Sequence, residues 1–336
     1  MASHAYKRLV AEGKGVLIFA FIFAIITRLA FYVSHMNDID IYMPIKGGYL
    51  WDSVAFLFSS PLVSLTASTV FTLFIALLLS KINTKHLFIR QPSVLPSAFV
   101  LLLFNCHPSF LIMRAEYIGL LFLLFAVDQL FGAYQSNKKQ HSALNVYVAI
   151  MVGSLFSPGM MLFIPFAWIG LGIMKSFNIK VFLVSLLCIV FTYFPFFSYY
   201  YFTENISQFY SPLISLMQTW DNLVLHSFNY LDYAFLFTGL LSLGILFFQY
   251  YINSYKDKIR TRMFFLSIFS MTIFGIILYL TGGIFASTMA LFATLLGASQ
   301  LYGHFFALNT NLSFKLYFIL YLVGYCFTFF HFHNLF

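Results

Sequence analysis

The feature that most constrains this chain is a series of long apolar runs separated by short polar segments. The first run extends from Gly15 to His35 and contains a single charged residue, Arg28. A helix needs about 20 apolar residues to cross the hydrocarbon core of a bilayer. The apolar residues are continuous within the runs and do not alternate over segments of about ten residues, which excludes a membrane β-barrel. The sequence therefore predicts an all-α fold, a polytopic transmembrane helical bundle.

The composition excludes the soluble classes of protein. Of the 336 residues, 61% are hydrophobic and only 8% are charged, whereas an ordinary soluble domain carries about 25% charged residues. The net charge of +8 does not indicate a nucleic-acid partner, because the basic residues form short clusters between apolar runs and no single patch. The three cysteines, Cys106, Cys188 and Cys326, lie far apart in apolar surroundings. We interpret them as packing residues, with no metal site.

The apolar runs predict about 11 helices in one integral membrane domain that covers residues 1–336. The predicted helices cover residues 15–35, 54–80, 92–111, 115–134, 144–157, 158–174, 181–202, 233–252, 263–281, 284–302 and 313–333. The fifth and sixth are short and are separated by Ser157-Pro158-Gly159, a strong helix breaker. They either cross the membrane twice or form a re-entrant pair.

The charge distribution predicts the orientation of the bundle. With a cytoplasmic N-terminus, 15 of the 18 Lys and Arg residues fall on the cytoplasmic side, as the positive-inside rule requires. This orientation places the C-terminus outside, favours two crossings for residues 144–174 and predicts the bacterial inner membrane as the location. Orientation thus accounts for most of the net positive charge. The exceptions are Arg28, Lys46 and Arg114.

Two acidic residues directly after the first helix are the candidate catalytic residues. Asp38 and Asp40 are spaced i, i+2, so their carboxylates point the same way in an extended segment. Paired carboxylates at a membrane surface can hold a divalent cation or act as a general base and positioning group. The alternative is a solvated loop whose acids only avoid the cytoplasmic side.

Four residues on the outer side are the candidate substrate-binding residues. Arg28 lies about two turns from the outer end of the first helix, where a charge is costly unless it pairs or faces water. It either binds a phosphate in an aqueous cleft, or it snorkels and pairs with Asp38 or Glu116 for structure alone. His107, Arg114 and Glu116 join the third and fourth predicted helices. They either supply a phosphate clamp and a carboxylate to the same cleft, or form an ordinary surface ion pair.

Asp128 is an acidic residue near the cytoplasmic end of the fourth predicted helix. An acid within a membrane span is a functional hypothesis by default. Lys138 and Lys139 lie close in the sequence. We therefore expect snorkelling and local pairing for Asp128.

The second long outer segment, residues 203–232, contains an amphipathic pattern. Apolar residues from Leu213 to Val224 recur at helical spacing, which is typical of a helix that lies on a membrane surface. Such a helix would cover a cleft for a lipid-linked substrate, or pack for structural reasons alone.

Residues 92–134 carry the patterns Pro-Ser-Val-Leu-Pro-Ser-Ala-Phe, His-Pro-Ser-Phe-Leu and Leu-Leu-Phe-Ala-Val-Asp-Gln-Leu-Phe. Together with the Ser157-Pro158 break and Thr192-Tyr-Phe-Pro195, they resemble a group of uncharacterised multi-pass inner-membrane proteins of Bacteroidota. More distantly, the arrangement looks like the GT-C superfamily of polyprenyl-phosphate-dependent glycosyltransferases and polysaccharide polymerases. That resemblance implies a catalytic or metal-holding role for Asp38 or Asp40, and binding of a lipid-linked phosphate by Arg28 and Arg114. The chain departs from the superfamily pattern because it lacks both a large external domain and a sharp acidic signature.

Three functions follow as hypotheses. The first is a GT-C-like enzyme of envelope glycan assembly that acts at the outer leaflet, with membrane lipid and a polyprenyl-phosphate-linked substrate as partners. The second is a transporter or flippase for a lipid-linked or anionic solute, with a cavity lined by Arg28 and the Ser157–Gly159 break. The third is a non-enzymatic scaffold subunit of an envelope complex.

Overall fold

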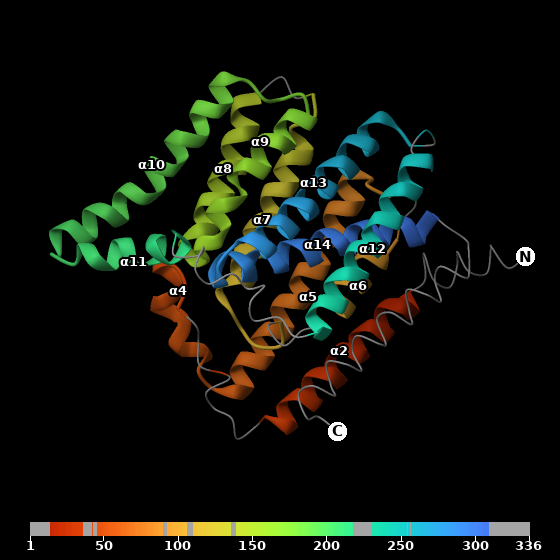
Figure 1. The fold of residues 1–336 in the computed structure, drawn as a ribbon, viewed down its shortest axis with the longest axis horizontal. Helices are drawn as coiled ribbons and strands as arrows, with labels where there is room; N and C mark the ends of the chain where they lie inside the picture. The colour runs from red at the N-terminus through yellow and green to blue at the C-terminus, as the bar shows by residue number, and fades with distance from the viewer. Residues whose placement is uncertain are drawn as a thin grey trace, which may run out of the picture.

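The computed structural model describes residues 14–35, 42, 46–89, 93–105, 110–135, 139–217, 230–253, 255 and 257–308. These residues form helices, and no strand occurs among them (Figure 1). The helices, with η for a 3-10 helix, are α2 (Lys14–Ser34), α4 (Tyr49–Val54), η2 (Ala55–Phe58), α5 (Pro61–His86), α6 (Leu95–Leu103), α7 (Ala115–Gly132), α8 (Lys139–Phe156), η4 (Pro158–Phe163), α9 (Ile164–Ile173), α10 (Ile179–Phe202), α11 (Ile206–Met217), α12 (Tyr230–Asn253), α13 (Ile259–Thr281) and α14 (Ile284–Leu308).

The all-helical prediction is confirmed for the described residues. Five of the helices, α2, α5, α7, α10 and α13, are long and apolar enough to cross a membrane. The protein therefore has the character of an integral membrane protein. The predicted helix at 313–333 lies outside the described residues, so the total number of helices and the side on which each terminus lies remain predictions.

Successive helices run up and down, so their ends gather at two ends of the bundle. We call the end that holds the start of α5 the outer end and the opposite end the inner end, following the predicted orientation. Lys46 and Arg114 lie at the outer end, whereas most basic residues of the described helix ends and turns gather at the inner end. Those at the inner end are Lys81, Lys85, Lys139, Lys175, Lys180, Lys258, Arg260 and Arg262. This is the asymmetry that the positive-inside rule predicts.

The centre of the bundle is α14, which packs against α13, α6, α7 and η4. Figure 1 shows α2 on one flank of this centre, and α10 with α11 extending from the other. Small residues permit the closest helix contacts, as is usual in membrane bundles. Gly297 of α14 lies against Thr272 of α13, and Gly303 of α14 lies against the backbone of Pro96 in α6.

The residues predicted as two short helices cross the bundle twice. Gly119, near the outer start of α7, packs against Ser157 and Met160, where α8 ends and η4 begins. At the inner end, the Ser176 hydroxyl that follows α9 donates to the Ala133 carbonyl that follows α7, at 2.6 Å. A 3-10 helix rises about 2.0 Å per residue and an α-helix about 1.5 Å, so η4 with α9 and the longer α8 each cover about 27 Å.

Several predicted helix boundaries are wrong: the helix predicted at 54–80 ends at His86, the one at 144–157 begins at Lys139 and the one at 284–302 ends at Leu308. Two further differences have a visible cause. The helix predicted at 54–80 begins instead at Pro61, because Ser60 caps it by accepting from the Val63 amide at 3.4 Å and proline suits the first helical position. The helix predicted at 92–111 ends at Leu103. The amide of the Asn105 side chain binds the Leu101 carbonyl there, which replaces a backbone partner at the helix end.

The close approach of α14 to α6 predicts a specific cost for a methyl group at Gly303. A Cβ at Gly303 would lie 2.7 Å from the backbone nitrogen of Pro96, so Gly303→Ala should destabilise the protein by about 1–3 kcal/mol through overpacking. Gly244→Ala is the matched control, because nothing lies within 4 Å of a Cβ at that helical glycine. Thermal unfolding in detergent, followed by circular dichroism, checks both. Equal midpoints for the two variants would contradict the packing described.

Candidate functional site

Arg28 is buried among oxygen atoms in the outer half of the bundle. The residue is 4% exposed, and each of its five N–H groups has an acceptor. The acceptors are Asn105 Oδ1 at 3.0 Å, Ser68 Oγ at 2.5 Å, Thr69 Oγ1 at 3.2 Å, Thr72 Oγ1 at 2.9 Å and the Phe110 carbonyl at 3.2 Å. None of them is a carboxylate, so neutral dipoles stabilise the charge of Arg28.

A row of hydroxyl groups on α5 supports the irregular backbone that follows α6. Ser64, Ser68 and Thr72 recur every four residues, so they share one face of α5. Ser64 accepts from the Met113 amide at 2.9 Å, and Ser68 donates to the Leu111 carbonyl at 2.6 Å. Lipid cannot satisfy backbone groups at this depth, so side chains must do it. The hydrogen bond from Arg28 to the Phe110 carbonyl satisfies a further backbone group of this segment.

Glu116 and Arg114 lie at the outer start of α7 and form no ion pair with each other. The Glu116 carboxylate is buried and accepts from Thr288 Oγ1 of α14 at 2.8 Å. Arg114 is half-buried, and its guanidinium makes no hydrogen bond or ion pair with any residue that the structure describes. Its Nε is shielded from solvent as well. A shielded donor without an acceptor is costly, so Arg114 is the guanidinium of this region that is open to an external anion.

Arg28 and Glu116, which one of the alternatives placed in a common cleft, face different elements. The residue of α7 that faces the Arg28 network is Tyr117, whose hydroxyl lies 3.2 Å from Thr72 Oγ1. Glu116 faces α14, on another side of the same helix turn. The pairing of Arg28 with Glu116 that the sequence offered as an alternative is therefore not formed.

Asp38, Asp40 and His107 lie outside the described residues, so their proposed roles remain predictions. Within the described ranges, no group of three His, Cys, Asp or Glu side chains could hold a metal ion. The divalent cation remains a prediction attached to Asp38 and Asp40.

An apolar groove of about 280 Å³ lies between α10 and α11. Its walls include Tyr193 and Phe197 of α10 and Phe209 of α11. Tyr49 of α4 holds α11 in place, because its hydroxyl donates to the Phe209 carbonyl at 2.6 Å and its ring stacks on the Phe209 ring. Burial raises the pKa of the Tyr49 hydroxyl, which therefore stays protonated as a donor. The helix α11 covers the first part of the amphipathic segment predicted from Leu213 onward.

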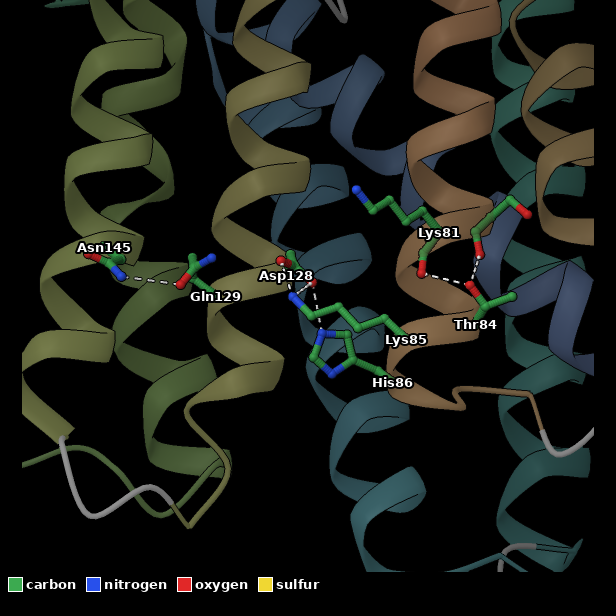
Figure 2. Close-up of polar contacts among 8 residues, drawn as sticks. Lys81, Thr84, Lys85, His86, Asp128, Gln129 and Asn145 are labelled. Atoms are coloured by element: carbon green, nitrogen blue, oxygen red, sulfur yellow. Dashed lines mark hydrogen bonds and ion pairs between the residues drawn. The ribbon is translucent and has the colours of Figure 1, made fainter.

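Asp128, near the inner end of α7, pairs with the end of α5 (Figure 2). Lys85 Nζ lies 2.7 Å from Asp128 Oδ2, and His86 Nε2 lies 2.8 Å from Oδ1. The side chain of Lys85 is 53% exposed, whereas that of His86 is 4% exposed. The local pairing expected with Lys139 is therefore not formed, and Lys138 lies outside the described residues.

The sequence signals for these contacts differ in kind. The hydroxyl row on α5 was visible as a four-residue spacing within one helix, and sequence reasoning missed it. Lys85 and His86 are separated from Asp128 by more than 40 residues, so no local periodicity joins them. The available signal was that α5 and α7 were predicted to end on the same side of the membrane.

The Arg28 network predicts a large loss of stability when the guanidinium is removed. Arg28→Gln leaves several buried oxygens without a donor, each at a cost of about 1–3 kcal/mol, so we expect a total loss of at least about 3 kcal/mol. Arg114→Gln is the matched control, since that guanidinium has no partner among the described residues. The measurement is the midpoint of thermal unfolding in detergent. A similar shift for both variants would show that the Arg28 hydrogen bonds contribute little.

The Asp128 cluster predicts unequal contributions from its two partners. The exposed Lys85 pair should contribute up to about 1 kcal/mol. The buried His86 bond to a charged acceptor should contribute about 1.5–3 kcal/mol. Double-mutant cycles that combine Asp128→Asn with Lys85→Gln or with His86→Phe measure each coupling energy. A larger coupling for Lys85 than for His86 would contradict this assignment.

Comparison with known proteins assigns no family. No protein-family model, no curated protein and no solved structure matches the chain. The resemblances to the Bacteroidota group and to the GT-C superfamily therefore remain predictions from the residues quoted for them. The described residues themselves belong to an all-helical protein with five helices long enough to span a membrane.

Proposed function

We propose that this protein is a membrane-embedded transferase of the GT-C-like kind, which acts at the outer leaflet on a substrate linked to polyprenyl phosphate. The observation that carries the proposal is Arg114. It is a half-buried guanidinium at the outer start of α7 without an acceptor among the described residues. A guanidinium binds a phosphate bidentately, and shielding from water strengthens the interaction.

The roles of the neighbouring residues follow from their chemistry. Arg114 would bind the phosphate that leaves when the bond between the sugar and its carrier breaks, and would stabilise its developing charge. Asp38 or Asp40 would accept the proton of the acceptor hydroxyl as that oxygen bonds to the sugar. Glu116, with its carboxylate held by Thr288, and His107 would orient the substrate.

The apolar groove between α10 and α11 supports a lipid-linked substrate. It is lined by aromatic and aliphatic side chains, and Met161 of η4 lies at its edge. The helix α11 contacts both η4 and α14, and Gly119, one turn into α7 from Glu116, packs on the same two elements. The groove and the start of α7 thus border the same part of the bundle, where a lipid chain and its phosphate would lie.

The transporter hypothesis has less support. It requires Arg28 and the Ser157–Gly159 break to face a cavity. Every N–H group of Arg28 is donated to a protein oxygen, and Ser157 is 1% exposed. No observation specifically supports the scaffold hypothesis. The exposed apolar face of α10 does not require a protein partner, because a helix that faces lipid has the same kind of surface.

The test is the effect of single substitutions on turnover of a polyprenyl-phosphate-linked sugar by the purified protein in vesicles. Arg114→Gln should lower kcat/KM about 10²-fold, as loss of a charge-stabilising donor does, and Arg114→Lys should restore part of it. Asp38→Asn and Asp40→Asn test the carboxylates. The control is Lys180→Gln, which removes a cation at the inner end.

If Arg114→Gln, Asp38→Asn and Asp40→Asn all bind and turn over lipid-phosphate substrates like the unmodified protein, the transferase proposal is wrong. Activity that falls in the Lys180→Gln control as well would point to a general loss of stability, which thermal unfolding measures separately.

A further inference from the structure

The start of α13 at the inner end carries three cations and no capping side chain. Lys258 is the N-cap residue, and Arg260 and Arg262 follow within the next four residues. The first N–H groups of a helix have no backbone partner, so this end of a helix is itself positive. Cations there are repelled by the helix dipole and by one another. A bound anion would relieve both effects.

These cations have no carboxylate partner among the residues that the structure describes. The guanidinium carbon of Arg260 lies over the Phe264 ring, 5.1 Å from its centroid. The Nε of Arg262 is shielded from solvent and has no hydrogen-bond partner in the described ranges. Asp257, which precedes them, is buried and already has an interaction of its own. No described carboxylate therefore forms an ion pair with these three cations.

His86 presents an unused hydrogen-bonding atom to the same region. Its side chain is 4% exposed, and its Nδ1 is buried without a partner in the described part of the chain. Figure 2 shows this nitrogen facing away from Asp128, toward the inner end of the helices. The His86 ring meets the Phe264 ring at 5.7 Å between centroids, and the Arg260 guanidinium lies over that same ring. When Nε2 donates to Asp128, Nδ1 of the neutral ring is an acceptor, which a hydroxyl group would satisfy.

Exposed apolar side chains lie next to His86 and Arg260, as is expected where a lipid headgroup binds. Leu87, next to His86, is 68% exposed, and Ile259, next to Arg260, is 57% exposed. Leu87 is the residue at which α5 ends and Ile259 is the first residue of α13, and both helices are long and apolar enough to span a membrane. Exposed apolar side chains beside unpaired cations fit a molecule that carries a phosphate and acyl chains together, whereas a free phosphate would leave the apolar part unused.

We propose that the inner ends of α5 and α13 form a binding site for the headgroup of an anionic phospholipid. Lys258, Arg260 and the first amides of α13 bind the phosphate. His86 accepts a hydrogen bond from a headgroup hydroxyl, and the acyl chains lie along Leu87 and Ile259. This site lies at the opposite end of the bundle from the transferase site, so it does not depend on the proposed function.

The experiment measures lipid binding to the delipidated full chain in detergent. Dioleoylphosphatidylglycerol, which carries a phosphate and free hydroxyls, is titrated against the thermal unfolding midpoint. Dioleoylphosphatidylcholine and inorganic phosphate are the comparison ligands. The test variant is Lys258→Gln/Arg260→Gln, and the matched control is Lys139→Gln/Lys180→Gln. The control removes two exposed cations from the first turns of α8 and α10 at the same end.

We expect the unmodified protein and the control to bind phosphatidylglycerol with similar affinity, and the test variant to bind it about tenfold more weakly. His86→Phe, which keeps the charges at the start of α13, should weaken phosphatidylglycerol binding as well. Equal affinity of the test and control variants would overturn the site. Stabilisation by inorganic phosphate alone, or equal binding of phosphatidylcholine, would overturn the choice of an anionic lipid.

Discussion

The outer half of this bundle depends on one guanidinium that is satisfied entirely by neutral oxygens. Arg28 joins α2 to the hydroxyl row of α5 and to the Phe110 carbonyl of the segment after α6. Residues 111–114 of that segment are not helical, and hydrocarbon cannot satisfy their backbone groups. A charged donor with five N–H groups in a fixed planar arrangement suits this task better than any single neutral side chain. The hydrogen bonds of the guanidinium offset the free-energy cost of burying its charge.

The charged residues at the two ends of the bundle have different kinds of partners. At the outer end, Glu116 is held by a hydroxyl of α14, and Arg114 has no acceptor in the described part of the chain. At the inner end, Asp128 is shared by Lys85 and His86, while the cations at the start of α13 outnumber the acids. In both places the group without a described partner is a cation at an end of the bundle. Both proposals therefore concern phosphates, one of them at each face of the membrane.

Sequence patterns predicted most of the helices because an apolar run of about 20 residues has few alternatives to a spanning helix. They failed where a single polar residue changed the backbone. Ser60 with Pro61 moved the start of α5, and Asn105 ended α6 early. A hydropathy value is an average over a window of many residues, so it does not detect a single capping side chain. The candidate site was foreseen in part: Arg28 was singled out by its depth, but its hydroxyl partners on α5 were not.

The sequence by itself determined the class of protein, a bundle of long apolar helices, and its charge distribution predicted the orientation. These depend on sums over many residues, namely hydropathy and charge, which no single contact can reverse. Only the tertiary structure decided which polar groups satisfy one another. Hydrogen bonds and ion pairs depend on distances of about 3 Å between residues far apart in the chain. In the folded protein the N–H groups of Arg28 donate to the protein's own oxygens. Arg114 and the cations of α13 have no hydrogen-bond acceptor among the described residues.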